Sequence, residues 1–174
     1  EAHSSLPHLG ANAIEVAAML VCELYRIAGD IAATGERSDR FDPAHSTLSV
    51  GTIHGGTARN ILARECSFHW EFRSLPGMAQ NHARERLDAY VRDVALPYLR
   101  RFAPHANIET VTEIEIPGLS PDADSQAAAL ALKLANSNRT IAVPFATEAG
   151  RFQSAGVSTI VCGPGSIAQA HQPN

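Results

Sequence analysis

The sequence predicts an α+β protein with a ferredoxin-like domain over residues 1–116, followed by part of an α/β domain over residues 117–174. Three observations lead to this prediction. Residues 66–73 alternate apolar and polar side chains with a period of two, which indicates a half-buried strand. The predicted elements of the first part follow the order helix, strand, strand, helix, strand, which is the βαββαβ plan with its first strand missing. After residue 116 the composition changes to short apolar runs and an alanine-rich helix.

The first predicted element is an amphipathic helix that runs from Asn12 to near Gly35. Asn12 is a good N-cap residue, and Glu15 three positions later completes a capping-box pattern. Apolar residues then recur at intervals of three and four, while Glu23 and most other charged residues fall on the opposite side. The residues predicted to form the apolar face are Ile14, Ala17, Ala18, Val21, Leu24, Tyr25, Ala28 and Ile31.

Two strands are predicted next, over residues 47–54 and 66–73. Asn60 lies in the loop before the second strand, and Arg73 ends its polar face, so these two residues bracket one strand. Glycines before this strand and a Pro-Gly pair after it free the backbone to meet a ligand or a neighbouring chain. On spacing alone two interpretations stay open, because Asn60 is also a normal turn residue and Arg73 a normal solvated strand end.

A second helix is predicted over residues 79–102, with a kink or an early end at Pro97. A third half-exposed strand is predicted over residues 108–116, where isoleucine and threonine alternate mainly with glutamate. The residues of the second helix that are predicted to face inward are Ala83, Leu87, Tyr90, Val91 and Val94.

The second part is predicted to hold a helix over residues 125–135, a short strand over 140–143, a helical turn over 150–155 and a strand over 157–162. The last strand is a continuous apolar run, which is typical of a strand covered on both faces of an α/β sheet. Two such units are too few for a stable sheet, so we expect the remaining strands of this domain to lie elsewhere in a longer protein.

Composition argues against several classes of function. The 174 residues are 45% hydrophobic and 18% charged, with a formal net charge of −4. No run of Lys or Arg is longer than Arg100-Arg101, so neither nucleic acid nor an anionic membrane is expected as a partner. The sequence contains no signal-peptide pattern and no apolar segment of membrane-spanning length. Three cysteines without a C-x-x-C pair favour buried thiols in a reducing compartment, and therefore a cytoplasmic protein.

A few polar residues are candidates for chemistry. His3 lies in a Ser-rich loop at a helix entrance, where a neutral imidazole could donate to an oxyanion or simply be a surface histidine. Thr147 and Glu148 follow a predicted strand, and Glu148 is either a contact for a cationic substrate group or a helix N-terminal carboxylate. Gly165 belongs to a Gly-Pro-Gly-Ser stretch that matches neither the phosphate loop nor the nucleophile elbow. His171 lies where a metal ligand could sit, but one histidine cannot hold zinc.

Several stretches together carry a resemblance to a known family. They are Ala2-His3-Ser4-Ser5 with Pro7-His8-Leu9-Gly10, Ile53-His54-Gly55-Gly56 with Asn60, Glu71-Phe72-Arg73 with Leu75-Pro76-Gly77, Thr147-Glu148-Ala149-Gly150, and Cys162-Gly163-Pro164-Gly165-Ser166 with Ala170-His171. In order and spacing they resemble the zinc-dependent amidohydrolases that include acetylornithine deacetylase, succinyl-diaminopimelate desuccinylase and aminoacylase. The resemblance covers nearly the whole chain, and the amino-acid sequence of the last two stretches is most similar to that of acetylornithine deacetylase.

The resemblance implies a cytoplasmic homodimeric hydrolase of two domains, which removes an N-acyl group from an amino acid in arginine biosynthesis by means of metal-activated water. Residues 1–116 would be a lid that dimerises through a helix and an edge strand, and residues 117–174 would be the C-terminal part of the catalytic domain. The residue matching His3 reaches the other subunit's active site in that family and helps to bind the oxyanion.

The resemblance also implies roles for the other candidates. Asn60 and Arg73 would hold the substrate, with the planar guanidinium of Arg73 on its carboxylate. Thr147, Glu148 and Gly165 would add substrate contacts. The last protein ligand of a site that holds two zinc ions, with cobalt as an alternative metal, would be His171.

The family's amino-terminal half, which carries the other metal ligands and the general base, is missing from this sequence. Because the chain also lacks an initial Met and stops within a loop, we predict that it is a fragment without amidase activity. Three functions stay open: an acetylornithine deacetylase-like hydrolase, a desuccinylase or aminoacylase of the same family, and a non-catalytic dimerisation module or remnant.

Overall fold

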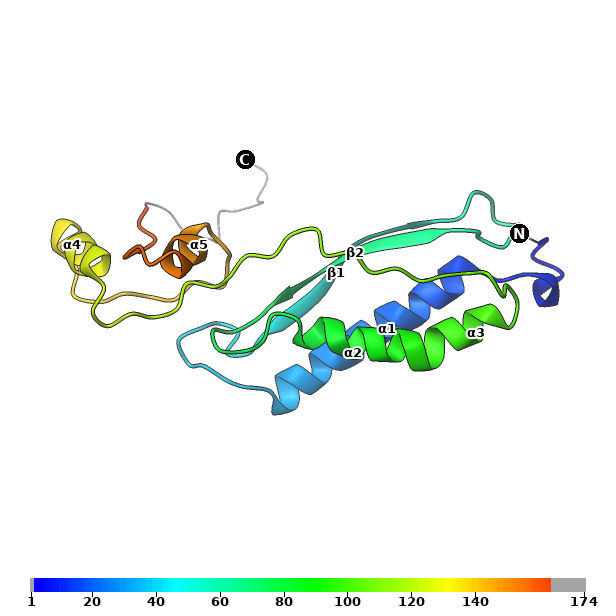
Figure 1. Cartoon of the computed structure of the whole chain (residues 1–174), viewed down its shortest axis with the longest axis horizontal. Coiled ribbons are helices and arrows are strands. Elements are labelled where there is room, and N and C mark those ends of the chain that lie inside the picture. Colours follow the sequence, from blue (N-terminus) through cyan, green and yellow to red (C-terminus); the bar gives the residue numbers. More distant parts are fainter. Residues whose placement is uncertain (1, 164–174) are drawn as a thin grey trace. The chain divides into compact units, whose positions relative to one another are not determined.

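The computed structural model describes residues 2–163, so the candidates Gly165 and His171 lie outside the described residues. The chain divides into two compact units, Glu1–Ile114 and Glu115–Asn174, which are called the first and second unit below. The first unit is a mixed α+β structure with a small antiparallel sheet (Figure 1). Its elements are η1 (Pro7–Leu9), α1 (Ala13–Thr34), β1 (Thr47–Gly55), β2 (Cys66–Arg73), α2 (His82–Tyr90), the π-helical turn η2 (Val91–Ala95) and α3 (Leu96–Arg100).

Strands β1 and β2 form an antiparallel hairpin, which confirms both strands predicted for this part of the sequence. The side chains of β2 alternate between half-buried and exposed along its whole length, as the period of two predicts. Helices α1 and α2 both lie on one face of the hairpin (Figure 1). The core between these layers consists of Val16, Leu20, Leu24, Ile27, Ile31, Leu48, Ala83, Leu87, Ala95 and Leu99.

Helix α1 begins and ends at the residues that its sequence predicts. The Asn12 side chain accepts a hydrogen bond from the backbone N–H of Ile14 at 3.1 Å, and the Gly35 N–H closes the last turn onto Ile31. The reciprocal half of the predicted capping box does not form, because the Glu15 carboxylate accepts a hydrogen bond from the Tyr98 hydroxyl at 2.6 Å instead. The N-cap prediction is therefore confirmed and the capping-box prediction is wrong.

The predicted apolar face of α1 is wrong at several positions. Ile14 and Tyr25 are 42% and 53% exposed, and Ala18 is exposed as well, whereas Glu23 is buried. The Arg26 guanidinium binds both carboxylate oxygens of Glu23 at 2.6 and 2.8 Å, which makes burial of that charge tolerable. The face that packs on the hairpin is therefore rotated toward Glu23, and a second apolar stripe is left on the surface of the helix.

The second predicted helix forms in three consecutive pieces, of which η2 is a π-helical turn just before Pro97. A π turn holds more residues per turn than an α-helix, so it shifts the phase of every later side chain. Ala83 and Leu87, before the turn, are buried as predicted, but Val94 is exposed and Ala95 takes the inward position. The prediction for Val94 is therefore wrong, because it assumed an unbroken α-helical period.

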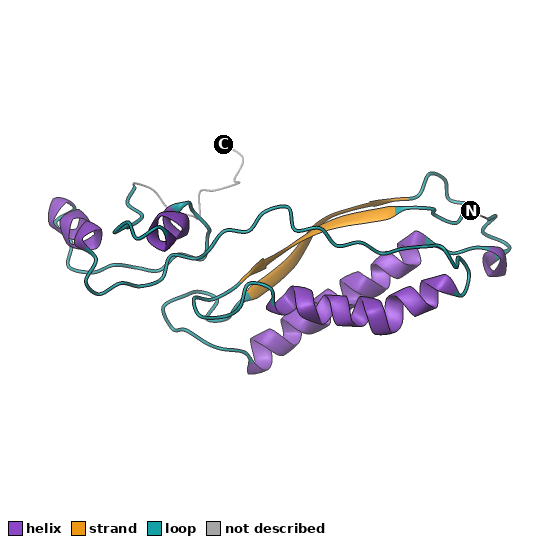
Figure 2. Cartoon of the chain, in the orientation of Figure 1, coloured by secondary structure: helices purple, strands orange, loops and turns teal. Residues whose placement is uncertain are grey.

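The strand predicted for residues 108–116 does not form, and Figure 2 draws this segment as loop. Within the described residues, side-chain contacts attach the segment to the rest of the first unit. Arg84 donates to the Thr110 carbonyl at 3.0 Å, and His69 on β2 lies 3.4 Å from the Glu113 carboxylate. A strand is defined by backbone pairing with a neighbour, and no neighbour within residues 2–163 provides it.

The second unit contains two helices in its described part, residues 115–163. These are α4 (Gln126–Leu134), capped by the Ser125 hydroxyl, and α5 (Ala149–Ser154), so both predicted helical segments are confirmed. The strands predicted over residues 140–143 and 157–162 do not form (Figure 2). An apolar strand gains from burial only when other strands and helices cover it, and the described residues supply no such cover.

The cysteines are not buried as predicted. Cys22 is exposed on α1 and Cys162 is exposed in the second unit. Cys66 is half-buried at the start of β2, and burial raises the pKa of its thiol. Within the part of the chain that the structure describes, no helix combines the length and the apolar character needed to cross a bilayer.

Candidate functional site

His3 and Asn60 lie next to each other although 57 positions separate them in the sequence. His3 forms an isolated antiparallel bridge with Ile61, and the backbone N–H of Ser4 donates to the Asn60 carbonyl at 2.9 Å. The His3 loop is therefore held against the loop that joins β1 to β2. The structure brings these two candidates together at one end of the hairpin.

The hydrogen bonds of His3 determine which of its two ring nitrogens carries the hydrogen when the ring is neutral. The backbone N–H of Ser5 donates to Nδ1 of His3 at 3.2 Å, and the Ser5 hydroxyl lies 2.8 Å from the same atom. Because a backbone N–H can only donate, Nδ1 must be the acceptor and the ring hydrogen must sit on Nε2. His3 thus presents an Nε2–H donor, which is the group that binding of an oxyanion requires.

Arg73 ends strand β2 and is held there by its neighbour on the same face of the strand. Its Nε and Nη2 donate to the two carboxylate oxygens of Glu71 at 3.0 and 3.1 Å. In the register of the hairpin Arg73 pairs with Thr47, whereas Cys66 pairs with Gly55 at the other end. Glu71 therefore helps to orient the guanidinium.

The three candidates of the first unit do not meet within one copy of the chain. Asn60 lies in the loop before Cys66, and Arg73 ends the strand that begins there. Seven steps along a strand at about 3.3 Å each correspond to roughly 23 Å. The pair of His3 and Asn60 and the side chain of Arg73 therefore lie at opposite ends of the hairpin.

Two candidates lie in the described part of the second unit. The hydroxyl of Thr147 accepts a hydrogen bond from the backbone N–H of Ala149 at 3.2 Å, which supports the first turn of α5. Glu148 is the N-cap residue of α5, and its carboxylate lies 3.5 Å from Nε of Arg151. Glu148 thus occupies the helix N-terminus and has a cationic neighbour within its own unit.

The described residues do not fit a zinc site. Among residues 2–163 no group of three or more His, Cys, Asp or Glu side chains lies close enough to hold a metal ion. A protein zinc site uses three or four such ligands. No step of a reaction can therefore be assigned to a metal held by the described part of this chain.

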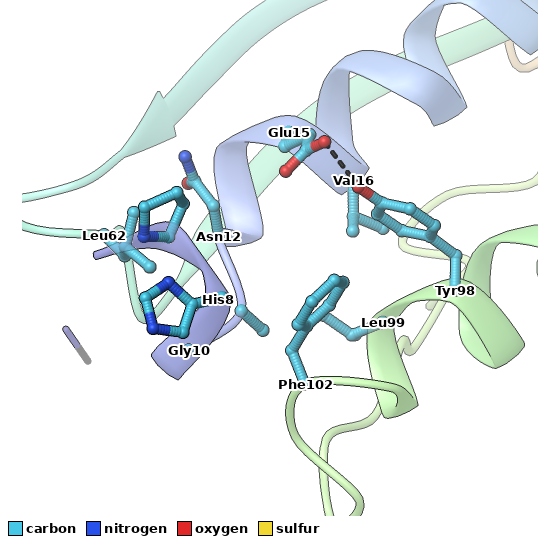
Figure 3. Close-up of a pocket in the computed structure, with 11 residues that line it drawn as sticks. His8, Gly10, Asn12, Glu15, Val16, Leu62, Tyr98, Leu99 and Phe102 are labelled. Atoms are coloured by element: carbon cyan, nitrogen blue, oxygen red, sulfur yellow. Dashed lines mark hydrogen bonds between the residues drawn. The ribbon is translucent and has the colours of Figure 1, made fainter. Parts of the chain in front are cut away.

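A cavity of about 340 Å³ opens between η1, the start of α1 and the end of α3 (Figure 3). The Glu15 carboxylate and the Tyr98 hydroxyl are joined at one side of it, and the Tyr98 and Phe102 rings meet edge to face. The hydrogen bond to Glu15, then burial, raise the pKa of the Tyr98 phenol. Sequence reasoning missed this cavity, because no local pattern links residues near 10 to residues near 100.

The first unit matches a known protein family over most of its length. Residues 1–99 match the M20_dimer family, described as the peptidase dimerisation domain. The chain belongs to this family. Acetylornithine deacetylase from Salmonella heidelberg strain SL476 is 35% identical over 174 residues, which are 99% of this chain and 43% of that protein. The enzyme of the same name from Salmonella arizonae is 34% identical over the same shares.

Family membership confirms the resemblance found in the sequence. The peptidase dimerisation domain accounts for residues 1–99, which include α1, the hairpin, α2 and most of α3. The chain spans less than half the length of the curated relatives that it matches. Those relatives are named as deacetylases, and the dimerisation domain makes up the first part of the stretch that they share with this chain.

Proposed function

We propose that this chain is the lid and substrate-clamping part of an N-acyl amino acid hydrolase of the acetylornithine deacetylase type. The observation that carries the proposal is the match of nearly the entire chain to proteins of that name at 35% identity. Residues 1–116 act as the lid and residues 117–174 belong to the catalytic domain, an assignment supported by the separation of the chain into two compact units near residue 115.

The lid has a ferredoxin-like plan in this proposal. Strand β2 has a backbone partner on one edge only within residues 2–163, and the segment 107–114 lies beyond it, attached by side chains. A strand placed between them would pair with both and complete the βαββαβ order. Ala106 and Ile108 already pack against the core, which supports this location for the segment.

The chain forms a homodimer through the outer stripe of α1 and the second edge of β1. The outer stripe is defined here as Ile14, Ala18, Cys22 and Tyr25, which are all exposed and follow one another at helical spacing. Helix α1 packs on β1 more than on β2, so stripe and strand edge lie on the same side of the first unit. A two-fold axis through both would join them to identical surfaces of a second copy.

This dimer would assemble a site that one copy cannot. Two β1 edges that pair antiparallel about a two-fold axis bring the Gly55 end of one strand beside the Thr47 end of the other. His3 and Asn60 lie near the Gly55 end, and Arg73 lies near the Thr47 end. An oxyanion donor from one copy and a carboxylate clamp from the other then face the same substrate.

The remaining candidates complete the proposal. Arg73 binds the substrate carboxylate and Asn60 helps to hold the substrate, while Thr147, Glu148 and Gly165 add contacts from the catalytic domain. His171 is one ligand of a dinuclear zinc site, which supplies an activated water when metal is bound. The other metal ligands and the general base belong to the part of the relatives that this chain does not span.

A mixing experiment with the full-length enzyme tests the proposal. His3→Ala is expected to lower turnover roughly 10²–10³-fold through loss of an oxyanion donor, and Arg73→Ala to raise KM for the acylated amino acid. Heterodimers of the two variants contain one site with both residues intact, so equal mixing should restore about a quarter of parental activity at a substrate concentration well below the KM of the Arg73→Ala variant. No recovery on mixing, with dimers present in sedimentation, would overturn the two-copy site.

Substrate preference distinguishes the deacetylase from a desuccinylase or general aminoacylase. The proposed role of Glu148 is to meet a cationic side chain such as that of ornithine. Glu148→Gln should therefore reduce kcat/KM for an N-acetylornithine substrate about tenfold and leave a neutral acylated amino acid unaffected. Equal effects on both substrates would favour the related activities.

A non-catalytic dimerisation module is the second candidate, supported by the absence of a metal cluster among residues 2–163. Sedimentation of the 174-residue chain combined with a zinc titration and a deacetylation assay separates the candidates. A dimer that neither binds zinc nor turns over substrate supports a dimerisation module for this chain. Turnover would show that the proposed assignment of the active-site residues is wrong.

A further inference from the structure

The cavity beside α1 and α3 lies entirely within the first unit, and its lining includes neither the outer-stripe residues of α1 nor Arg73. We propose that it binds a small primary alkylammonium ion, with the nitrogen on the Glu15 carboxylate and the chain against the apolar wall. This inference is independent of the proposed hydrolytic function. The lining residues are Pro7, His8, Gly10, Ala11, Asn12, Glu15, Val16, Leu62, Tyr98, Leu99 and Phe102.

The charge of the cavity selects a cation. Glu15 is the one lining residue with a full formal charge at neutral pH, since the wall contains no Lys, Arg or Asp and His8 is counted as neutral. The described residues place no Lys, Arg or His within ion-pair distance of Glu15. The Glu15 side chain is exposed, so a cation can reach its carboxylate, and the attraction between them is screened by salt.

The geometry of Glu15 suits an ammonium group. The Tyr98 hydroxyl donates to Oε1 of Glu15 at 2.6 Å and so fixes the carboxylate at the side of the cavity (Figure 3). Oε2 has no hydrogen-bond partner among residues 2–163 and remains as an acceptor. An ammonium donates up to three hydrogen bonds, so it can bind Oε2 and keep contacts with water. The Arg101 guanidinium already lies over the Tyr98 ring, 5.9 Å from its centroid, so Tyr98 contributes its hydroxyl to the site and not its aromatic face.

The size and the walls restrict the rest of the ligand. A volume of about 340 Å³ is at the lower end of the range for small-molecule sites. Val16, Leu62 and Leu99 supply an apolar wall for a short methylene chain. Glu15 would repel a carboxylate on the ligand. Amines are therefore preferred over carboxylic acids and over zwitterions of the same length.

Binding of n-pentylammonium to the 174-residue chain, followed by NMR shifts of the Val16 and Leu62 amides, tests the proposal. Saturable shifts are expected with n-pentylammonium, at least about tenfold weaker binding with n-pentanol, and none with pentanoate. Equal affinity for the amine and the alcohol would overturn the proposal. A lysine side chain of another protein is the alternative source of the same ammonium group. Tighter binding of N-acetyl-lysine methylamide than of n-pentylammonium would overturn the small amine as the ligand.

Variants provide the second arm of the experiment. Glu15→Gln should weaken binding of n-pentylammonium about tenfold or more, and Tyr98→Phe should weaken it severalfold because the carboxylate loses its fixed orientation. Glu36→Gln, an exposed carboxylate beyond the other end of α1, is the matched control and should bind like the parent. Unchanged binding in both Glu15→Gln and Tyr98→Phe would contradict the assignment.

Discussion

The two units of this chain differ in how much of their apolar surface they bury. In the first unit two helices cover one face of a hairpin, and Leu24 and Ile27 are completely buried between them. In the second unit α4 buries none of its residues, and Leu134 is 78% exposed. Both units have well-capped helices, so local helix signals alone do not distinguish them. The comparison shows that a core depends on having a second layer to pack against.

The largest expected effect tests this contrast directly. Leu24→Ala should lower the free energy of unfolding by about 2–5 kcal/mol, because it opens a cavity in the core of the first unit. Leu134→Ala should change it by less than about 0.5 kcal/mol, since an exposed side chain loses little on truncation. Urea denaturation followed by circular dichroism measures both changes. Similar losses in the two variants would contradict the contrast between the units.

A smaller effect is expected from two buried serines, one in each unit. The Ser46 hydroxyl accepts from the backbone N–H of Leu75 at 2.8 Å and donates to the Met78 sulfur at 3.3 Å. Ser46→Ala leaves that buried N–H without its partner and should cost about 1–3 kcal/mol of global stability. In the second unit Ser125→Ala removes the cap of α4, which accepts from the Ala128 N–H, and the hydrogen bond to the Ser158 hydroxyl at 3.1 Å.

Hydrogen exchange separates the two serine variants. Ser46→Ala should speed exchange across the protected core of the first unit, whereas Ser125→Ala should speed it in α4 alone. Faster exchange in β1 and β2 after Ser125→Ala would mean that the second unit contributes to the stability of the first.

The smallest expected effect concerns the ion pairs that join α1 to α2. Arg86 donates to Asp30, and Arg26 donates to the same carboxylate at 3.0 Å. The hydrogen bond from Arg86, assisted by the charges of both arginines, lowers the pKa of Asp30. A lowered folded-state pKa stabilises the fold above the ordinary aspartate pKa of about 3.9, and this contribution is lost as the pH falls through the folded value.

Asp30→Asn should therefore lower Tm slightly at pH 7, and the difference from the parent should shrink as the pH falls below the ordinary aspartate pKa of about 3.9. Thermal unfolding at several pH values measures this difference. Glu36→Gln, an exposed carboxylate without an ion pair among residues 2–163, is the control and should show no such dependence. A difference that grew at low pH would contradict the assigned sign.

The sequence predicts those parts of the fold that depend on local patterns. The hairpin strands and the N-cap at Asn12 follow from alternation and capping chemistry, and both are observed. The orientation of α1 could not be predicted, because burial of Glu23 depends on its bidentate pair with Arg26. The inward position of Ala95 depends on a π turn, and no residue type in the sequence predicts such a turn.

The candidate site shows the same division. Spacing predicts that Asn60 precedes one strand and that Arg73 ends it, and the structure has Asn60 in the loop before β2, which runs from Cys66 to Arg73. The contact between the His3 loop and the Asn60 loop depends on backbone hydrogen bonds between distant segments, which no local pattern contains. The cavity beside Glu15 and Tyr98 was missed for the same reason.

The one-sided pairing of β2 has a practical consequence for anyone who purifies this chain. Unsatisfied N–H and C=O groups along a strand edge are a template for intermolecular β-structure, and Val111 and Ile114 nearby are exposed and apolar. Concentrated samples should thus form open-ended aggregates in addition to the proposed dimers. A gatekeeper charge such as Val111→Lys should suppress the aggregates and leave dimerisation through α1 intact.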